Sequence, residues 1–212
     1  DRPEQKGKRS IISGIEHSAV INMAKYFDEH KGNPVEILRC NQDGIVSLED
    51  LEQALQQGNV ALVSIMAANN ETGVIQPYQE IAKICQKHQV PFACDTTQLI
   101  GKEDFDFTHS GIDYAFTSSH KVGALIGSGM ILVKNPTELR PFLLGGGQER
   151  GLRGGTQNYV AIETMAVAMK SFEASKNKLQ LVKDQRDAFE KSIKQEFPQV
   201  VIMGENAPRL AG

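Results

Sequence analysis

The sequence lacks the features of secreted, membrane-spanning and dinucleotide-binding proteins. Its cysteines are Cys40, Cys85 and Cys94, which form no C-x-x-C motif and no paired framework. They give no support to disulfides or to structural zinc, and they favour a reducing compartment, taken here as the cytoplasm. No apolar run approaches membrane-spanning length, so no membrane partner is expected. No G-x-G-x-x-G follows a predicted strand, and a net charge of −3 makes nucleic acid a poor partner.

What is present is enough apolar material for a packed core. Of the 212 residues, 40% are hydrophobic and 23% are charged, which is typical of a folded domain. The length permits one large domain, or one domain with part of another. Because the chain opens on Asp1 and stops at Gly212 without a helix stop, we expect a piece of a longer protein that is inactive by itself.

Apolar runs of strand type alternate with helical patterns in the first two thirds of the chain. Strands are predicted at 10–12, 35–39, 60–67, 92–95, 114–117 and 129–133, and helices at 18–30, after the cap Ser47 and after Pro77. This rhythm predicts an α/β fold, with a mostly parallel sheet covered by helices on both faces.

The composition and pattern of the sequence change after residue 144. A glycine- and arginine-rich loop runs from Gly145 to Gly155, and a helical pattern then extends over 158–197 with a break at 175–177. The apolar run at 200–203 resembles the first strand of a further unit. We therefore predict a cofactor-binding large domain at 1–144, and at 145–212 a hinge loop, connecting helices and the start of a smaller α+β domain.

Polar residues follow three predicted strands at their carboxyl ends. They are Asn69-Asn70, Asp95 and Ser118-Ser119-His120-Lys121, and ligands of parallel sheets bind at that edge. Burial of a lysine after a strand would lower the pKa of its amine, which suits a covalent bond to an aldehyde. The hydroxyls and the imidazole that precede Lys121 suit a phosphate group. Together with the lysine, they predict a site for pyridoxal phosphate. A solvated lysine in a strand-end loop is the alternative interpretation.

Further segments carry a resemblance to a known family. Residues 14–20 (GIEHSAV) match its "EHxAV" segment, residues 68–77 (ANNETGVIQP) its "NNExGxxQ" loop, and residues 145–156 (GGGQERGLRGGT) its "GGGxERGxRxGT" loop. Asp95-Thr96-Thr97-Gln98 and Ser118–Lys121 lie between them in the same order. The chain resembles the cysteine desulfurases of the class V aminotransferase group, which are fold-type I pyridoxal-phosphate enzymes.

The resemblance implies roles around the cofactor ring. Lys121 matches the lysine that bonds to pyridoxal phosphate and then moves the substrate Cα proton. Asp95 matches the aspartate that faces the pyridine nitrogen. His17 matches the histidine that stacks on the ring and can carry protons, and Gln98 matches the residue that bonds the phenolic oxygen. Taken alone, Asp95 could equally cap a turn, His17 begin a helix and Gln98 be a surface amide.

The resemblance also implies phosphate, substrate and partner contacts. Ser118 and His120 match phosphate contacts, and Thr156 matches a threonine that reaches the phosphate of a neighbouring subunit, which implies a homodimer. Asn70 matches the residue that binds the substrate carboxylate, whereas Asn69 is expected to shape the turn. The implied substrate is L-cysteine, and its sulfur would pass to an acceptor protein for iron–sulfur cluster assembly or thiolation.

The chain departs from the family pattern in its lysine segment. Residues 122–127 read VGALIG in place of the usual Tyr-Gly-Pro-Lys-Gly stretch, and Ser119 stands where glycine is usual. The family's loop cysteine, its N-terminal phosphate loop and its carboxylate-binding arginine have no match in these residues. A selenocysteine lyase, a sulfide-releasing cysteine lyase, an aminotransferase and a cofactor-free structural or partner-binding domain therefore stay open as alternatives.

Overall fold

The computed structural model describes residues 5–212, so the opening residues 1–4 lie outside the described part of the chain. A six-stranded sheet has the order β2-β1-β3-β4-β5-β6. The strands are β1 (Arg9–Ser13), β2 (Val35–Leu38), β3 (Val60–Ser64), β4 (Phe92–Asp95), β5 (Tyr114–Ser118) and β6 (Gly129–Val133). Neighbouring strands are parallel, except that β6 runs antiparallel to β5. The predicted mostly parallel sheet is confirmed.

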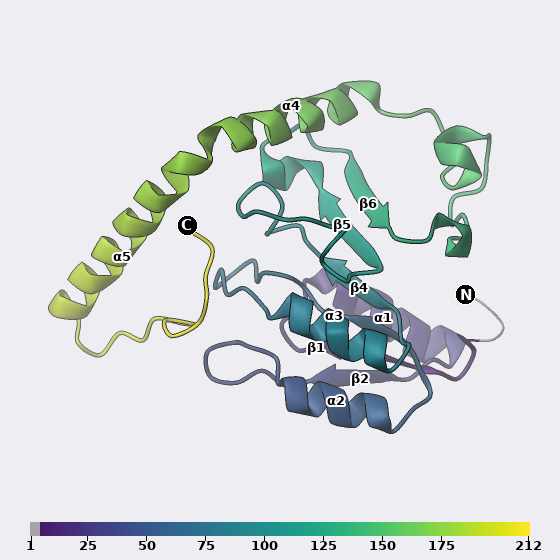
Figure 1. The fold of residues 1–212 in the computed structure, drawn as a ribbon, viewed down its shortest axis with the longest axis horizontal. Coiled ribbons are helices and arrows are strands. Elements are labelled where there is room, and N and C mark those ends of the chain that lie inside the picture. The colour runs from purple at the N-terminus through teal and green to yellow at the C-terminus, as the bar shows by residue number, and fades with distance from the viewer. Residues whose placement is uncertain (1–4) are drawn as a thin grey trace.

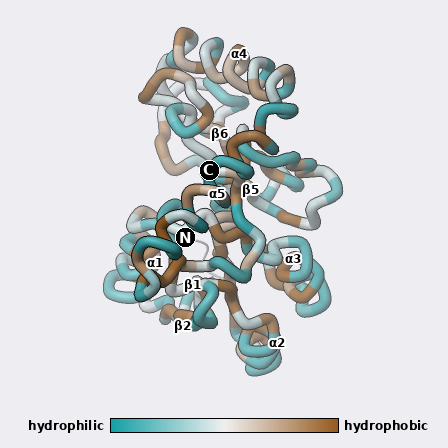
Figure 2. The backbone as a smooth tube through the Cα atoms, turned by 90° about the vertical axis from the view of Figure 1, so that its left-hand side faces the viewer, coloured by the Kyte–Doolittle hydropathy of each residue, from teal (hydrophilic) through white to brown (hydrophobic). Residues whose placement is uncertain are grey.

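Helices cover both faces of this sheet, as predicted. Figures 1 and 2 place α1 (Ser18–Lys31) on one face, and α2 (Leu48–Gln56) and α3 (Tyr78–Lys87) on the other. The helix starts follow local chemistry: the Ser47 side chain accepts a hydrogen bond from the Asp50 amide at 3.1 Å, and α3 begins directly after Pro77. Helix α1 ends where Gly32 adopts the left-handed conformation that glycine tolerates.

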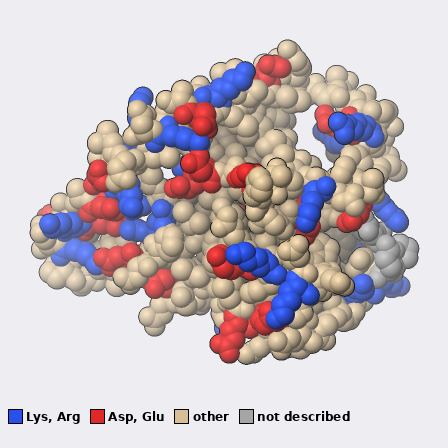
Figure 3. Space-filling model, in the orientation of Figure 1, with Lys and Arg blue, Asp and Glu red and all other residues tan. Residues whose placement is uncertain are grey.

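The core lies between the sheet and the pair α2 and α3. It is built from apolar side chains of these elements, with Leu51, Ile81 and Phe92 fully buried. The other face is more open, because Ala24 is the buried residue of α1. On the face shown in Figure 3, basic and acidic side chains are intermixed. No helix within residues 5–212 is long and apolar enough to cross a membrane.

Strand β3 is shorter than predicted. It ends at Ser64, whereas the apolar run continues to residue 67. The run stays buried, since the amides of Ile65 and Ala67 still donate to the carbonyls of Ala93 and Asp95, at 3.2 and 2.8 Å. The hydrophobicity of residues 65–67 predicted their burial correctly. A continuous run of apolar residues cannot show where the regular hydrogen bonding of the strand stops.

Two long helices follow the sheet, and the coil after the second one leads back toward it. Helix α4 (Tyr159–Ser175) is followed by the short 3-10 helix η5 (Lys176–Lys178) and by α5 (Leu179–Glu196), so the predicted break is confirmed. In Figure 1, α4 and α5 form an arc beside the sheet. The strand predicted at 200–203 is wrong: these residues form coil and a turn, with Val201 and Met203 exposed. An apolar run becomes a strand only where it finds a partner strand.

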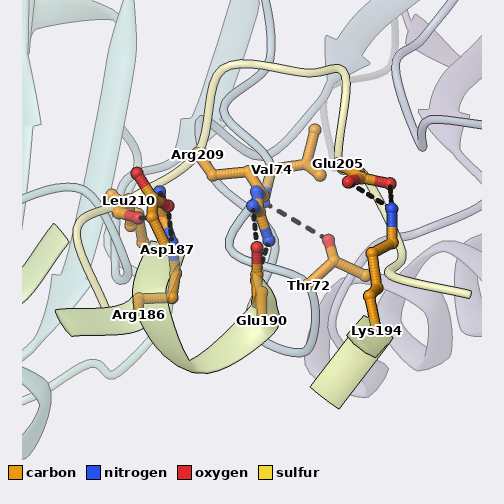
Figure 4. A network of polar contacts seen from close by, with 9 residues as sticks. All are labelled: Thr72, Val74, Arg186, Asp187, Glu190, Lys194, Glu205, Arg209 and Leu210. Atoms are coloured by element: carbon orange, nitrogen blue, oxygen red, sulfur yellow. Dashed lines mark hydrogen bonds and ion pairs between the residues drawn. The ribbon is translucent and has the colours of Figure 1, made fainter. Parts of the chain in front are cut away.

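The final residues pack against the loop that follows β3. The amide of Leu210 donates to the Gly73 carbonyl at 2.9 Å, and the Ile75 amide donates to the Pro208 carbonyl at 2.8 Å. Figure 4 shows Arg209 in this segment facing Glu190 of α5, with distances of 2.6 and 2.7 Å between their charged atoms. The end of the chain is therefore fastened both to α5 and to the loop after β3.

Candidate active site

The predicted site residues meet at the carboxyl edge of the parallel strands. His17 follows β1, Asn70 lies beyond β3, Asp95 and Gln98 lie at the end of β4, and Ser118–Lys121 follow β5. Because β1, β3, β4 and β5 are neighbours in that order, these side chains succeed one another along a single edge. Thr156 is the predicted site residue that does not lie there.

Asp95 is a buried carboxylate on the face of β4 opposite the core. Its side chain is on the other side of the strand from Cys94, which is fully buried among core residues. One oxygen, Oδ1, accepts a hydrogen bond from the Thr97 amide at 2.9 Å. Within residues 5–212 no hydrogen bond is made to Oδ2. Asp95 thus caps its turn with Oδ1.

Lys121 lies on the short 3-10 helix η2 (Ser119–Val122) that directly follows β5. Its side chain is exposed, which contradicts the expected desolvation of the amine. The physical reason is its position, since one helical turn past the strand the side chain has left the packed layer of the sheet. Next to it, Ser118 Oγ and His120 Nδ1 lie 2.9 Å apart.

The unusual Ser119 has a structural role in the loop that follows the lysine. Its side chain is fully buried, and its Oγ lies 2.6 Å from the Leu125 carbonyl oxygen and 2.7 Å from that of Ser128. A hydroxyl has one proton, so these two carbonyls share a single donor. The Ser119 amide also donates to the Ser128 carbonyl at 3.1 Å. Ser119 therefore closes the VGALIG loop from inside.

His17 and Asn70 are exposed at their strand ends. The Nδ1 atom of His17 accepts from the Ala19 amide at 3.2 Å, so the residue is the N-cap of α1. The Nδ2 atom of Asn70 lies 2.6 Å from Glu71 Oε1. Asn69 shapes the turn as predicted, because its Oδ1 accepts from the amides of Glu71 and Thr72 at 2.9 and 3.0 Å.

Glu16 is a buried carboxyl group that sequence reasoning assigned no role. Its Oε1 accepts from the Met66 amide at 2.8 Å and from the Ser13 hydroxyl, while its Oε2 is buried and has no hydrogen-bond partner among residues 5–212. Burial raises the pKa of Glu16 to about 7, and the negative charge of Asp95 adds to the effect. Its place in the "EHxAV" segment was a signal, but nothing in the pattern indicated burial.

The cysteines are unsuited to nucleophilic chemistry. Burial raises the pKa of Cys85 to about 12 and that of Cys94 well above its usual value. Cys40 is half-buried, and its pKa is raised by burial and by the charge of Glu16. Since the thiolate is the reactive form, the raised pKa values lower the fraction of each cysteine that is reactive at neutral pH. Within residues 5–212 no cluster of three or more His, Cys, Asp or Glu side chains could hold a metal ion.

Thr156 lies apart from the edge, on the loop that precedes α4. Its side chain is exposed. Near the start of the same connection, Phe142 and Leu144 are 91% and 83% exposed, so large apolar side chains there are uncovered in this single chain. The Thr156 side chain is therefore accessible to solvent in this single chain.

Comparison with known proteins places these observations in a family. The family model described as aminotransferase class-V matches residues 2–211. Cysteine desulfurase IscS of Ehrlichia chaffeensis is 34% identical over 213 residues, which cover 99% of this chain and 52% of the relative. The chain thus spans about half the length of that relative.

Solved structures agree with the sequence comparisons. The crystal structure of a NifS-like protein from Rickettsia africae superposes with a TM-score of 0.88 at 33% identity, covering 96% of this chain and 56% of that one. A structure described as SspA in complex with cysteine gives a TM-score of 0.80 at 33% identity, with coverage of 95% and 56%. The likeness therefore extends over nearly all of the residues described here.

Proposed function

Because this chain belongs to the class-V aminotransferase family, and within it to the cysteine desulfurases, we propose that it forms the cofactor-binding part of an enzyme that removes sulfur from L-cysteine. The carbon product would be L-alanine, and the sulfur would pass to a thiolate as a persulfide, for iron–sulfur cluster assembly or thiolation. The observation that carries the proposal is the succession of His17, Asn70, Asp95 and Lys121 at four adjacent strand ends.

The donor set at this edge fits pyridoxal 5'-phosphate. Asp95 is a buried residue, and within residues 5–212 no hydrogen bond is made to its Oδ2, which suits a protonated pyridine nitrogen. Ser118, His120 and the start of η2 supply donors for a phosphate at the end of the adjacent strand. The Lys121 amine would bond to the aldehyde. When bound, the cofactor would draw electrons from the substrate Cα and so make its proton acidic.

The remaining residues would bind substrate and move protons. We assign the exposed Asn70 to the substrate carboxylate and the His17 ring to one face of the cofactor. Lys121 and His17 are the groups proposed to take and return the Cα proton. None of the three cysteines of this chain serves as sulfur acceptor in the proposal, since all have raised pKa values.

The proposed assembly is a homodimer in the cytoplasm that delivers sulfur to an acceptor protein. Exposed Thr156 would reach the phosphate site of the second subunit, and the uncovered Phe142 and Leu144 beside its loop support an interface there. The three unpaired cysteines support a reducing compartment. We also propose that the chain divides near residue 145 into a large domain and the start of a smaller one.

Borohydride trapping tests the assignment of Lys121. We expect that incubation with pyridoxal 5'-phosphate, reduction and digestion will label the peptide containing Lys121, and that Lys121→Ala will lose this label. Lys102 is the matched internal control, because it is a second lysine close to the site with a pKa lowered by burial. Labelling of Lys102 in preference to Lys121, or equal labelling of the Lys121→Ala variant, would refute the assignment.

A further inference from the structure

Lys102 holds the side chain of Gln98 in one orientation. It lies four residues after Gln98, in the turn that follows β4, and is half-buried. Its Nζ atom contacts Gln98 Oε1 and lies 3.3 Å from the Gln98 carbonyl oxygen. One amine thus contacts both the side chain and the backbone carbonyl of Gln98. Gln98 is the residue that matches the family's hydrogen bond to the phenolic oxygen of the cofactor.

The chemistry of the ammonium group determines which end of the amide it binds. A lysine ammonium donates hydrogen bonds and accepts none, so its partner in the Gln98 side chain is the oxygen. The amide NH2 group is then left to point elsewhere. Rotating the amide by half a turn would place NH2 against the ammonium and lose the bond, so Lys102 selects one of two otherwise similar orientations.

The turn that carries Lys102 packs closely against the helix that carries Lys121. A Cβ atom on Gly101 would lie 3.0 Å from Val122 Cγ1, so the backbone of the turn directly adjoins η2. Burial lowers the pKa of Lys102, and the positive charge of Lys121 lowers it further. Lys102 is therefore within electrostatic reach of Lys121, while its own amine is engaged by Gln98.

We propose that Lys102 is a positioning residue that turns the Gln98 amide so that its NH2 group donates to the phenolic oxygen of pyridoxal 5'-phosphate. The inference rests on the proposed function of the site. A phenolate oxygen is an acceptor, so the opposite orientation of Gln98 would set two acceptors against each other. Lys102 touches neither substrate nor cofactor in this role and acts through Gln98 alone.

Lys102→Met keeps most of the length of the side chain and removes the donor. We expect its dissociation constant for pyridoxal 5'-phosphate to rise about fivefold to tenfold, as for the loss of one hydrogen bond. The absorption maximum of the bound cofactor should also shift, because the phenolic oxygen loses its donor. Lys102→Arg should restore both values. The matched control is Lys83→Met, an exposed lysine on α3, which should change neither.

A double-mutant cycle separates a role through Gln98 from a direct one. In the Gln98→Leu background, Lys102→Met should weaken cofactor binding by no further factor. An undiminished effect in that background would overturn the proposal, as would unchanged binding in Lys102→Met alone. If the wild-type protein itself fails to bind pyridoxal 5'-phosphate, the proposed function fails instead, so the two failures are distinguishable.

Side-chain amide NMR of Gln98 supplies a readout that needs no cofactor. In the cofactor-free protein, Lys102→Met should shift the Gln98 side-chain NH2 resonances and speed their exchange with solvent, while Lys102→Arg leaves them near their wild-type positions. Resonances that do not move in Lys102→Met would show that Lys102 does not hold the amide, and would overturn the inference.

Discussion

At the scale of single residues, Glu16 joins two of the strand ends that carry the candidate site residues. Its Oε1 links the turn after β1 to the Met66 amide beyond β3. Asn69 makes a second link, since its Nδ2 donates to the Ile15 carbonyl at 3.0 Å. His17 follows directly on this clamped turn, and Asn70 follows directly on Asn69. The two exposed site residues are therefore carried by backbone that buried polar groups hold in place.

The raised pKa of Glu16 predicts a specific dependence of stability on pH. The folded protein holds a proton on Glu16 up to about pH 7, whereas the unfolded chain releases it near the ordinary glutamate pKa of 4.5. Glu16 therefore contributes most stability below pH 4.5 and loses that contribution as the pH rises through 7. In Glu16→Gln the group is neutral at every pH and the slope is removed.

Urea denaturation of both proteins at pH 5 and pH 7.5 measures this difference. Between these values, the wild type should lose roughly 2 to 3 kcal/mol of unfolding free energy that Glu16→Gln does not lose. Glu196→Gln, a change of an exposed residue on α5, is the control and should follow the wild type. Parallel pH profiles for the wild type and Glu16→Gln would contradict the assignment of this pKa.

Strand alternation and turn chemistry made some residue environments predictable. Cys94 and Asp95 face opposite sides of β4, and Asn69 shapes its turn, because both properties depend on immediate neighbours. The burial of Glu16 was not predicted, and the burial predicted for Lys121 was wrong. Burial of Glu16 depends on Met66, which is distant in sequence, and exposure of Lys121 depends on where η2 leaves the sheet.

At the scale of elements, the helices were predictable because their ends carry local signals. Ser47, Pro77 and Gly32 each mark a helix boundary through their own hydrogen bonds or backbone angles. The strand predicted at 200–203 failed because its existence depends on a partner strand. The residues of this region that do pair are centred on Arg209, which forms an antiparallel bridge with Val74.

The ion pair of Arg209 with Glu190 should stabilise the packing of this segment on α5. The two side chains are 9% and 19% exposed, whereas those of the neighbouring pair Lys194 and Glu205 are 39% and 43% exposed (Figure 4). Water screens the second pair more strongly. The hydrogen bond from Arg209 lowers the pKa of Glu190, so the coupling is fully present above the ordinary glutamate pKa of 4.5 and declines as the pH falls below it.

A double-mutant cycle of Arg209→Met and Glu190→Gln measures that coupling. At pH 7 we expect about 1 to 2 kcal/mol of interaction free energy from denaturation curves, because the pair is bidentate and mostly shielded. The matched cycle of Lys194→Met and Glu205→Gln should give less than about 0.5 kcal/mol. Equal couplings for the two pairs would show that burial does not distinguish them.

At the scale of the whole molecule, the last residues of the chain pack against the sheet formed by the first two thirds of the chain. Leu210 and Ala211 are 3% and 7% exposed, and Leu210 belongs to the core formed by the sheet with α2 and α3. The change of composition near residue 145 indicated where the glycine-rich loop begins. It could not indicate that residues 208–210 return to pair with 73–75, since nothing in either segment specifies a partner more than a hundred residues away.

This return predicts that a change at the end of the chain destabilises the sheet. Leu210→Ala removes a buried side chain that packs in the main core, and we expect a loss of about 2 to 4 kcal/mol of unfolding free energy. Hydrogen exchange should rise in the 73–75 loop and also in β3 and β4, because their side chains share that core. Val201→Ala, at a 78% exposed apolar residue of the same segment, is the matched control and should leave both measurements unchanged. Exchange confined to residues 205–212 in Leu210→Ala would mean that the segment opens alone, as a surface strap that the sheet does not need.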